Sequence, residues 1–355
     1  MKRRRFLLLL GAILGSLGVI GAANFWPYLK YYLTPVETTS GIIKAQKPNR
    51  FIDEEGKSIV GVVLGTGQQD EVADMVKTSV DIIGGIENLD IAGKTALLKP
   101  NLNSGDLYPA STNPQVVKGV IEMLYNAGAS KVIVGDMSNP SYRTEDAMKR
   151  AGITDVVEET GASSAYFEEG EWMLIKIPGV KHIREIILSK SVYDADVLID
   201  MPTVKTHSMA TYTMSMKNFI GVIHHKSRMS MHRSQNLEEA IAELNLAIHP
   251  DLIVMDGTRS MVSGGPMKGT VKNTNLIVAS GDRIANDIIG LSVVKKFGLW
   301  ERVSNKDVWD QTQIKKALEL SIGRGRDEIK LVNHSFHGEE SSDALLKDIQ
   351  QISGL

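Results

Sequence analysis

The stretch DVLIDMPTVKTHSMATYTMSMKNFIGVIHH, residues 196–225, begins as an apolar strand and continues as a segment rich in cations, amides and imidazoles. Its first part, Asp196–Pro202, is a short apolar run of the kind that is typical of strands buried on both faces. Its second part carries Lys205, His207 and Lys217. A buried strand that ends in such a segment predicts a parallel sheet with a ligand site at the carboxyl end of the strand.

Five further short apolar runs predict strands of the same sheet, and the amphipathic stretches between them predict helices. The strands are predicted at Ile59–Gly65, Lys94–Asn101, Lys131–Asp136, Asp251–Gly257 and Thr274–Asp282. The helices are predicted at Gln68–Ile83, Pro114–Asn126, Leu237–Ile248, Arg283–Phe297 and Gln311–Leu320. Short apolar strands that alternate with amphipathic helices indicate an α/β fold with a mainly parallel sheet and helices on both faces.

The chain is expected to divide into four parts. These are a signal or membrane anchor over residues 1–26, a tether over 27–58, an α/β domain over 59–335 and a C-terminal tail or helix over 336–355. Within the domain, residues 153–184 show a less regular pattern and are expected to form a small insert.

The first segment has the pattern of an export signal or a membrane anchor. Four basic residues, Lys2–Arg5, precede an apolar run from Phe6 to Trp26, which at about 20 residues is long enough to span a bilayer. Arg3-Arg4-Arg5-Phe6-Leu7 also resembles the twin-arginine export pattern, an Arg-Arg pair followed by x-Phe-Leu. The positive-inside rule then predicts an extracytoplasmic protein, either anchored to the cytoplasmic membrane or released after signal cleavage.

Composition excludes several classes of function. The net charge of −2 provides no basic field for nucleic acid, so no nucleic-acid partner is expected. The absence of cysteine excludes disulfides, thiolate zinc sites and cysteine-ligated iron–sulfur clusters. Any metal would need imidazole, carboxylate, amide or carbonyl ligands.

Polar side chains follow the carboxyl ends of several predicted strands, where open parallel sheets bind their ligands. They are Lys99, Asn101, Asp136, Lys205, His207 and Asp256. Polar residues also follow strands wherever a turn comes next, which is the structural alternative. A set that combines lysines, an amide and an imidazole favours a binding site over turns alone.

Two Lys/Asn pairs and the second part of the opening stretch suggest an anion site. Lys99, Lys205 and Lys217 could neutralise an anion, and Asn101 and Asn218 could orient it. We therefore expect these side chains to bind a small anionic molecule or an anionic cofactor.

Lys205 and His207 share one face if their backbone is extended. A neutral imidazole beside a cation suits a base, so His207, His232 and Lys205 are the candidate catalytic residues. A surface basic patch is the alternative interpretation. His207 and His232 could also hold a divalent metal together with Asp256, although their spacing matches no standard ligand motif.

Gly264 and Gly265 form a glycine-bearing loop that could bring backbone N–H groups close to a phosphate. The loop lacks both the Gly-x-Gly-x-x-Gly and the Gly-Lys-Ser/Thr arrangements, so a standard dinucleotide or P-loop site is not indicated. A phosphate-containing cofactor of another kind remains an expectation.

Taken in order, these residues resemble the family named "domain of unknown function 362". The motifs are Lys99-Pro100-Asn101, Thr112, Gly135-Asp136, Pro202-x-x-Lys205-Thr206-His207, Lys217-Asn218-x-x-Gly221, His232, Asp256-Gly257, Gly264-Gly265-Pro266 and Asp282-x-x-Ala285-x-Asp287. The resemblance extends over roughly residues 59–331. Many relatives carry a ferredoxin-like cluster module, from which this cysteine-free chain departs.

Two classes of function agree with these patterns. The first is an enzyme that acts on a small anionic substrate, or uses an anionic or metal cofactor, at the carboxyl edge of the sheet. The twin-arginine pattern favours it, because that route carries folded proteins with their cofactors. The second is a non-catalytic extracytoplasmic anion-binding protein or envelope scaffold, because anion capture needs only the lysines and amides. Both would contact a membrane through the N-terminal helix.

Overall fold

A computed structural model describes residues 35–336 and 339–355 of the chain. The predicted anchor, residues 1–26, and the first part of the predicted tether lie outside this range. Within it, no helix is long and apolar enough to span a membrane.

A ten-stranded sheet forms the centre of the described fold. The main path runs β13 (Ile329–Ser335), β2 (Ser58–Leu64), β12 (Gly269–Ser280), β11 (Leu252–Gly264), β8 (Val197–Met201), β3 (Thr95–Pro100), β4 (Lys131–Asp136) and β5 (Ser163–Tyr166). Off this path, β9 (Thr203–His207) pairs with β11, and β10 (Thr211–Thr213) pairs with β9. All the predicted strands are present in this sheet.

The sheet is mixed, so the prediction of a mainly parallel sheet needs correction. β12 runs antiparallel to both of its neighbours, β2 and β11. β11 extends past Gly257 to Gly264, and β12 begins at Gly269, so a tight hairpin joins them. A parallel return needs a crossover of a dozen or more residues, which this connection does not provide.

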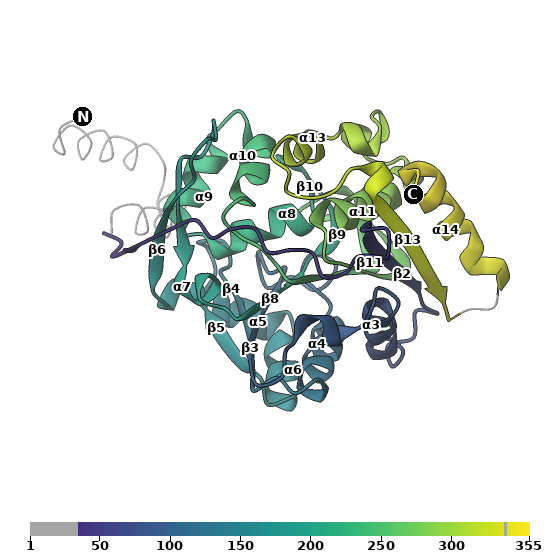
Figure 1. Cartoon of the computed structure of the whole chain (residues 1–355), viewed down its shortest axis with the longest axis horizontal. Coiled ribbons are helices and arrows are strands. Elements are labelled where there is room, and N and C mark those ends of the chain that lie inside the picture. The colour runs from purple at the N-terminus through teal and green to yellow at the C-terminus, as the bar shows by residue number, and fades with distance from the viewer. Residues whose placement is uncertain (1–34, 337–338) are drawn as a thin grey trace, which may run out of the picture.

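Helices cover both faces of the sheet, as the sequence predicts, and each face has its own apolar core (Figure 1). One core includes side chains of α3 (Val72–Asp81), α4 (Pro114–Asn126), α5 (Thr144–Arg150) and α6 (Ile153–Glu159). The other includes side chains of α8 (Ser215–Asn218), α9 (His225–His232), α10 (Leu237–Leu244), α11 (Arg283–Phe297), α13 (Thr312–Glu319) and α14 (Glu339–Ser353). The short helices α7 (Lys190–Tyr193) and α12 (Glu301–Ser304) lie between these elements in the chain.

Capping side chains fix where two of the predicted helices begin. Asn113 accepts a hydrogen bond from the backbone N–H of Gln115, and Pro114 follows as the first helical residue of α4. Asp282 accepts from the N–H groups of Ile284 and Ala285 at the start of α11. These caps belong to the sequence itself, which is why both helices begin at the predicted residues.

A second, three-stranded sheet joins two regions that were expected to be irregular. Its strands are β1 (Thr39–Gly41), β6 (Trp172–Lys176) and β7 (Glu185–Ser189). The segment predicted as an insert therefore divides its strands between two sheets, because β5 pairs with β4 of the large one. The described part of the predicted tether runs across the molecule from β6 to β2, and its Phe51 is fully buried (Figure 1).

Residues 196–225 cross the middle of the fold. They form β8, β9, β10, α8, the 3-10 turn Phe219–Val222 and the start of α9. Every residue of β8, β9, β10 and α8 is buried, the lysines included. The polar half of the stretch is therefore held inside the molecule at the carboxyl end of β8.

Candidate functional site

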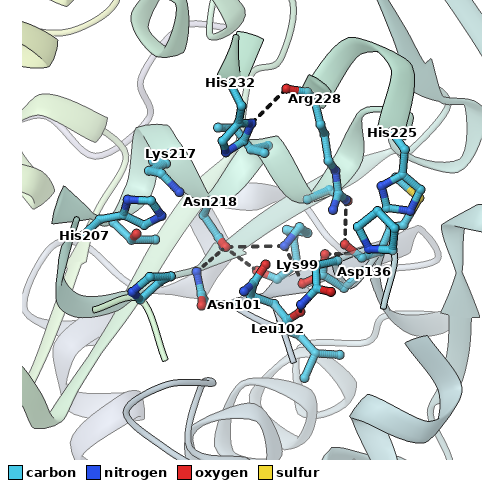
Figure 2. A pocket seen from close by; sticks show the side chains of 18 of the residues that line it. Lys99, Asn101, Leu102, Asp136, His207, Lys217, Asn218, His225, Arg228 and His232 are labelled. Carbon is cyan, nitrogen blue, oxygen red and sulfur yellow. Dashed lines mark hydrogen bonds and ion pairs between the residues drawn. The ribbon is translucent and has the colours of Figure 1, made fainter. Parts of the chain in front are cut away.

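A cavity of about 310 Å³ lies at the carboxyl ends of β3 and β4, beside β9, and Figure 2 shows the side chains that line it. It is lined by seven of the predicted site residues, which are Lys99, Asn101, Lys205, His207, Lys217, Asn218 and His232. Three other predicted residues, Asp256, Gly264 and Gly265, do not line it. The structure thus brings together cations, amides and imidazoles that are spread over more than 130 positions of the sequence.

Lys99 and Asp136 form a buried ion pair at the floor of the cavity. Lys99 Nζ lies 2.7 Å from Asp136 Oδ2 and also donates to the carbonyl oxygen of Pro100, at 2.6 Å. Both side chains are 1% exposed. Burial lowers the pKa of Lys99 and raises that of Asp136, and their mutual attraction opposes both changes. The charge of Lys99 is therefore balanced within the protein.

The two amides connect the lysines to one another. Asn218 accepts from Asn101 Nδ2 at 2.9 Å, and its own Nδ2 donates to Asp200 Oδ1 at 2.7 Å. Asn101 Oδ1 in turn accepts from Lys205 Nζ. Burial raises the pKa of Asp200 well above its usual value, which favours the neutral acid. Most of the hydrogen-bonding capacity of these amides is therefore used inside the protein, where it fixes the positions of the lysines.

Lys205 and Lys217 add positive charge that no nearby carboxylate neutralises directly. Lys205 donates to Asn101 and to the carbonyl oxygen of Ala110, at 2.6 Å, and burial with its lysine neighbours lowers its pKa to about 7. Lys217 is 8% exposed, and no hydrogen bond or ion pair joins it to another described residue. Burial and the nearby Arg228 lower the pKa of Lys217 to about 7 as well. The cavity can therefore accept negative charge.

The imidazoles of His207 and His232 are held in opposite tautomers. His207 Nδ1 accepts from the backbone N–H groups of Met209 and Ala210, both at 3.1 Å, so the neutral ring carries its proton on Nε2. His232 Nδ1 lies 2.8 Å from the carbonyl oxygen of Arg228, which can only accept. Nδ1 of His232 therefore carries the proton, and its Nε2 is left as an acceptor. Burial and Lys217 lower the pKa of both rings.

Arg228 is a cavity residue that the sequence reasoning missed. Its guanidinium is buried and donates to the carbonyl oxygens of Met137, Ser138, Gly221 and Ile223. These bonds tie α9 to the loop after β4 and to the turn after α8. The spacing of Arg228 and His232, four residues apart, would have placed both on one face of a helix.

Gly221 allows this turn to approach the ion pair. A Cβ atom at this position would lie 2.4 Å from Asp136 Oδ1 and 2.6 Å from Lys99 Nζ. A larger residue would push into the ion pair, so the motif Lys217-Asn218-x-x-Gly221 has a packing reason for its glycine.

The structure does not bring the proposed metal ligands together. Asp256 accepts from the N–H of Asn113 at 2.8 Å and from the N–H and hydroxyl of Thr258 at 2.9 and 2.6 Å. In the neutral tautomer that the two backbone hydrogen bonds favour, Nε2 of His207 carries a proton and has no lone pair for a metal. Among the described residues, no group of three or more His, Asp or Glu side chains could hold a metal ion.

Gly264 and Gly265 form the turn of the β11–β12 hairpin instead of lining the cavity. Both have positive φ angles, +78° and +76°, which favour glycine. A Cβ at Gly265 would lie 1.9 Å from the carbonyl oxygen of Thr206, so the turn packs directly on β9. This contact places the next residue, Pro266, in the cavity wall.

The fold and the cavity define an α/β protein with a buried, cationic site. The chain belongs to the family described as Domain of unknown function (DUF362), whose profile matches residues 96–292. It is similar to the thylakoid-associated protein sll1697 of Synechocystis sp., with 30% identity over 222 residues, which cover 60% of this chain and 67% of that protein.

Two solved structures match the chain with low identity and low TM-scores. The lactate racemase apoprotein of Thermoanaerobacterium thermosaccharolyticum matches with a TM-score of 0.40 and 9% identity, over 86% of this chain and 88% of its own. A protein from Thermotoga maritima matches with a TM-score of 0.33 and 11% identity, over 81% of this chain and 58% of its own.

Proposed function

We propose that the chain is an enzyme that acts on a small anion held in the cavity. The observation that carries this proposal is Lys217, a buried cation with no partner among the described residues, on the wall of a cavity. A buried charge without a partner destabilises a protein, so its presence is best explained by a ligand that supplies the opposite charge. An attraction of this kind is strong where water is excluded.

The residues divide into those that bind, those that move a proton and those that hold the frame. Lys205 and Lys217 would bind the anionic group. His207 would donate a hydrogen bond from Nε2, and His232 would accept a proton at Nε2. The ion pair of Lys99 keeps this arrangement in place. One donor imidazole and one acceptor imidazole beside two cations are suited to proton transfer on a bound anion.

Binding of sulfate, followed by isothermal calorimetry on the full chain, tests the anion site directly. Lys217→Met keeps the shape of the side chain without its charge, and we expect it to weaken sulfate binding by at least about tenfold, or about 1.4 kcal/mol. Lys77→Met, at an exposed lysine paired with Asp81, is the matched control and should bind as the wild type does. Equal sulfate affinity in all three proteins would contradict the proposal.

Native mass spectrometry of gently purified protein separates a substrate from a resident cofactor. A phosphate-containing cofactor would stay bound at one per chain, whereas a substrate would be found in part or not at all. The same experiment addresses the alternative of a non-catalytic anion-binding protein or envelope scaffold. If the wild type binds a ligand whose mass stays unchanged over many hours, the result would favour the non-catalytic alternative. If the wild type converts the ligand to a product of different mass, and His232→Gln still binds the ligand but does not convert it, the result would favour the enzyme.

We further propose that residues 1–26 export the protein and tether it to a membrane. The basic start and the apolar run support the tether. The description of the cyanobacterial relative as thylakoid-associated also supports membrane association. In this arrangement the cavity would lie outside the cytoplasm, where it would meet exported or envelope-derived anions.

A further inference from the structure

We propose that Lys217 is a nucleophilic amine that forms an imine with a carbonyl group of the anion, so that the substrates are small aldehydes or ketones that also carry a carboxylate or phosphate. This inference rests on the proposed function of the same cavity and adds the substrate class to it. It starts from a difference among the three lysines that line the cavity.

Of the three described lysines that line the cavity, Lys217 alone has an amine without a hydrogen-bond or ion-pair partner among the described residues. Lys99 is held by Asp136 and by the carbonyl oxygen of Pro100. Lys205 is held by Asn101 and by the carbonyl oxygen of Ala110. A lysine that donates its N–H groups to fixed protein acceptors is held in place as a cation and can bind an anion. A lysine without such acceptors can turn its nitrogen lone pair toward a carbonyl carbon.

The surroundings of Lys217 favour the neutral amine, which is the nucleophilic form. Apolar side chains of Leu102, Met137 and Ile220 line the same cavity, and burial lowers the pKa of Lys217 to about 7. The charged and titratable groups that line the cavity with it are Lys99, Asp136, Lys205, His207, His225, Arg228 and His232. At about pH 7.5 most of a lysine with such a pKa is neutral, against roughly one in a thousand for an exposed lysine.

Two imidazoles stand on either side of the amine in Figure 2, His207 on one side and His232 on the other. In the first step the Lys217 nitrogen bonds to the carbonyl carbon, and the electron pair of the C=O bond moves to oxygen. The Nε2–H of His207 stabilises that oxygen by a hydrogen bond. His232 Nε2 accepts a proton from the nitrogen and returns it to the oxygen, which gives a hydroxyl group.

The second step repeats the proton transfer from nitrogen to oxygen through His232. The remaining N–H proton passes through His232 to the hydroxyl group, the C–O bond breaks, and water leaves as the C=N bond forms. One amine and one carbonyl group thus give one imine and one water, with no oxidant or reductant. Lys205 also has a pKa of about 7, and the bound anionic group favours its protonated form, in which it positions that group.

Reductive trapping with glyoxylate, the smallest molecule with both an aldehyde and a carboxylate, tests the proposal. Full-length protein is treated with limiting glyoxylate and cyanoborohydride at about pH 7.5, and peptide mapping locates the carboxymethyl-lysine. We expect Lys217 to be labelled on the order of a hundredfold faster than exposed lysines such as Lys77, because so much more of it is neutral. Sulfate should slow labelling at Lys217 and leave Lys77 unaffected, because sulfate occupies the same cavity.

Three outcomes distinguish the proposed anion site from the proposed imine. If sulfate binding depends on Lys217 but Lys217 is not labelled preferentially, the imine is overturned and the anion site is retained. If sulfate does not bind and Lys217 is not labelled preferentially, the imine and the proposed function are both overturned. Preferred labelling of Lys205 contradicts the assignment of the nucleophile. Lys217→Met, checked for an intact fold by its melting curve, should lose only the fast-labelled position.

Discussion

At the scale of one residue, Lys217 is a buried lysine for which the described part of the chain supplies no carboxylate partner. Arg228 lies nearby and adds a second positive charge. The neighbouring Lys99, which is buried to a greater extent, receives Asp136 at 2.7 Å. The sequence predicts that both lysines belong to one anion site, but it could not predict which of them would find a partner.

Replacement of Lys217 by methionine should stabilise the ligand-free protein. The methionine removes a buried charge, and we expect a gain of about 1–3 kcal/mol in the free energy of unfolding, or roughly 2–8 °C in melting temperature. The folded-state pKa is about 7 and the unfolded value is 10.5. The unfolded state therefore binds more protons between these values, and wild-type stability rises across that window. The gain should be largest below about pH 7 and should shrink toward about pH 10.

Thermal unfolding of both proteins across this pH range checks the prediction, with Lys77→Met as the exposed control. A Lys217→Met variant that is less stable than the wild type at low pH would show that Lys217 has a structural partner. A gain independent of pH would show that its pKa is not lowered.

Sulfate affinity should fall as the pH rises above about 7. Lys205 and Lys217 have pKa values of about 7 in the empty cavity, and a bound anion favours their protonated forms. Above that pH, each lysine that must take up a proton lowers the apparent affinity by about tenfold per pH unit. Sulfate keeps its own charge over this range, so calorimetry between about pH 6 and pH 9 reports the protein alone. A constant affinity across the range would mean that the lysines are already fully charged.

At the scale of elements, the β11–β12 hairpin determines part of the site without giving a polar side chain to it. Its turn packs on β9 and brings Pro266 to the cavity wall. The sequence pattern predicts Gly264 and Gly265 at a phosphate, because two glycines after a strand fit such a site, and it predicts a loop after Gly257. The extended pairing of β11 with β12 over that region replaces the loop and also makes the sheet mixed.

Alanine at Gly265 should separate the hairpin from β9. The residue combines a φ angle of +76° with a Cβ position 1.9 Å from the carbonyl oxygen of Thr206. We expect a loss of at least about 2 kcal/mol in the free energy of unfolding, with weaker sulfate binding because the wall that contains Pro266 moves.

Gly161→Ala is the matched control for this change. Gly161 has a similar φ angle of +73°, and nothing lies within 4 Å of the position that a Cβ would take there. Gly161→Ala should lower the free energy of unfolding by about 1 kcal/mol, from backbone strain without a steric clash, and should leave sulfate binding unchanged. Equal effects of the two substitutions, measured by denaturant unfolding and calorimetry, would mean that the contact with Thr206 is not important.

At the scale of the whole molecule, the described part of the chain forms one α/β body with a core on each face of its large sheet. The described part begins at residue 35, and its first strand, β1, pairs with β6. The tether proposed for residues 1–26 would hold this body at a membrane.

Removal of residues 1–26 should move the protein from the membrane fraction to the soluble fraction of its host. In the proposal the apolar run would supply the affinity for the bilayer, and no helix among the described residues is long and apolar enough to span it. Replacement of Arg3 and Arg4 by lysines keeps the charge and removes the arginine pair, so it should reduce export if the twin-arginine route is used. Fractionation and protease protection of the three proteins give the answer. Full-length protein that is entirely soluble before any cleavage would contradict the tether.

The sequence by itself determined the α/β class, the positions of the main strands and helices, and seven of the polar side chains that line the cavity. These follow from local periodicity, from caps such as Asn113 and Asp282, and from the rule that ligands meet the carboxyl ends of strands.

Only the tertiary structure decided the direction of β12 and the partners of the three lysines. The Lys205–Asn101 bond joins residues 104 positions apart, and the Lys99–Asp136 pair spans 37. Partners at such separations depend on how strands pair and how deeply each side chain is buried, and local sequence does not encode either. Lys217 is buried without a carboxylate partner among the described residues, and burial lowers its pKa to about 7. The proposed function depends on the missing partner, and the proposed imine depends on the lowered pKa.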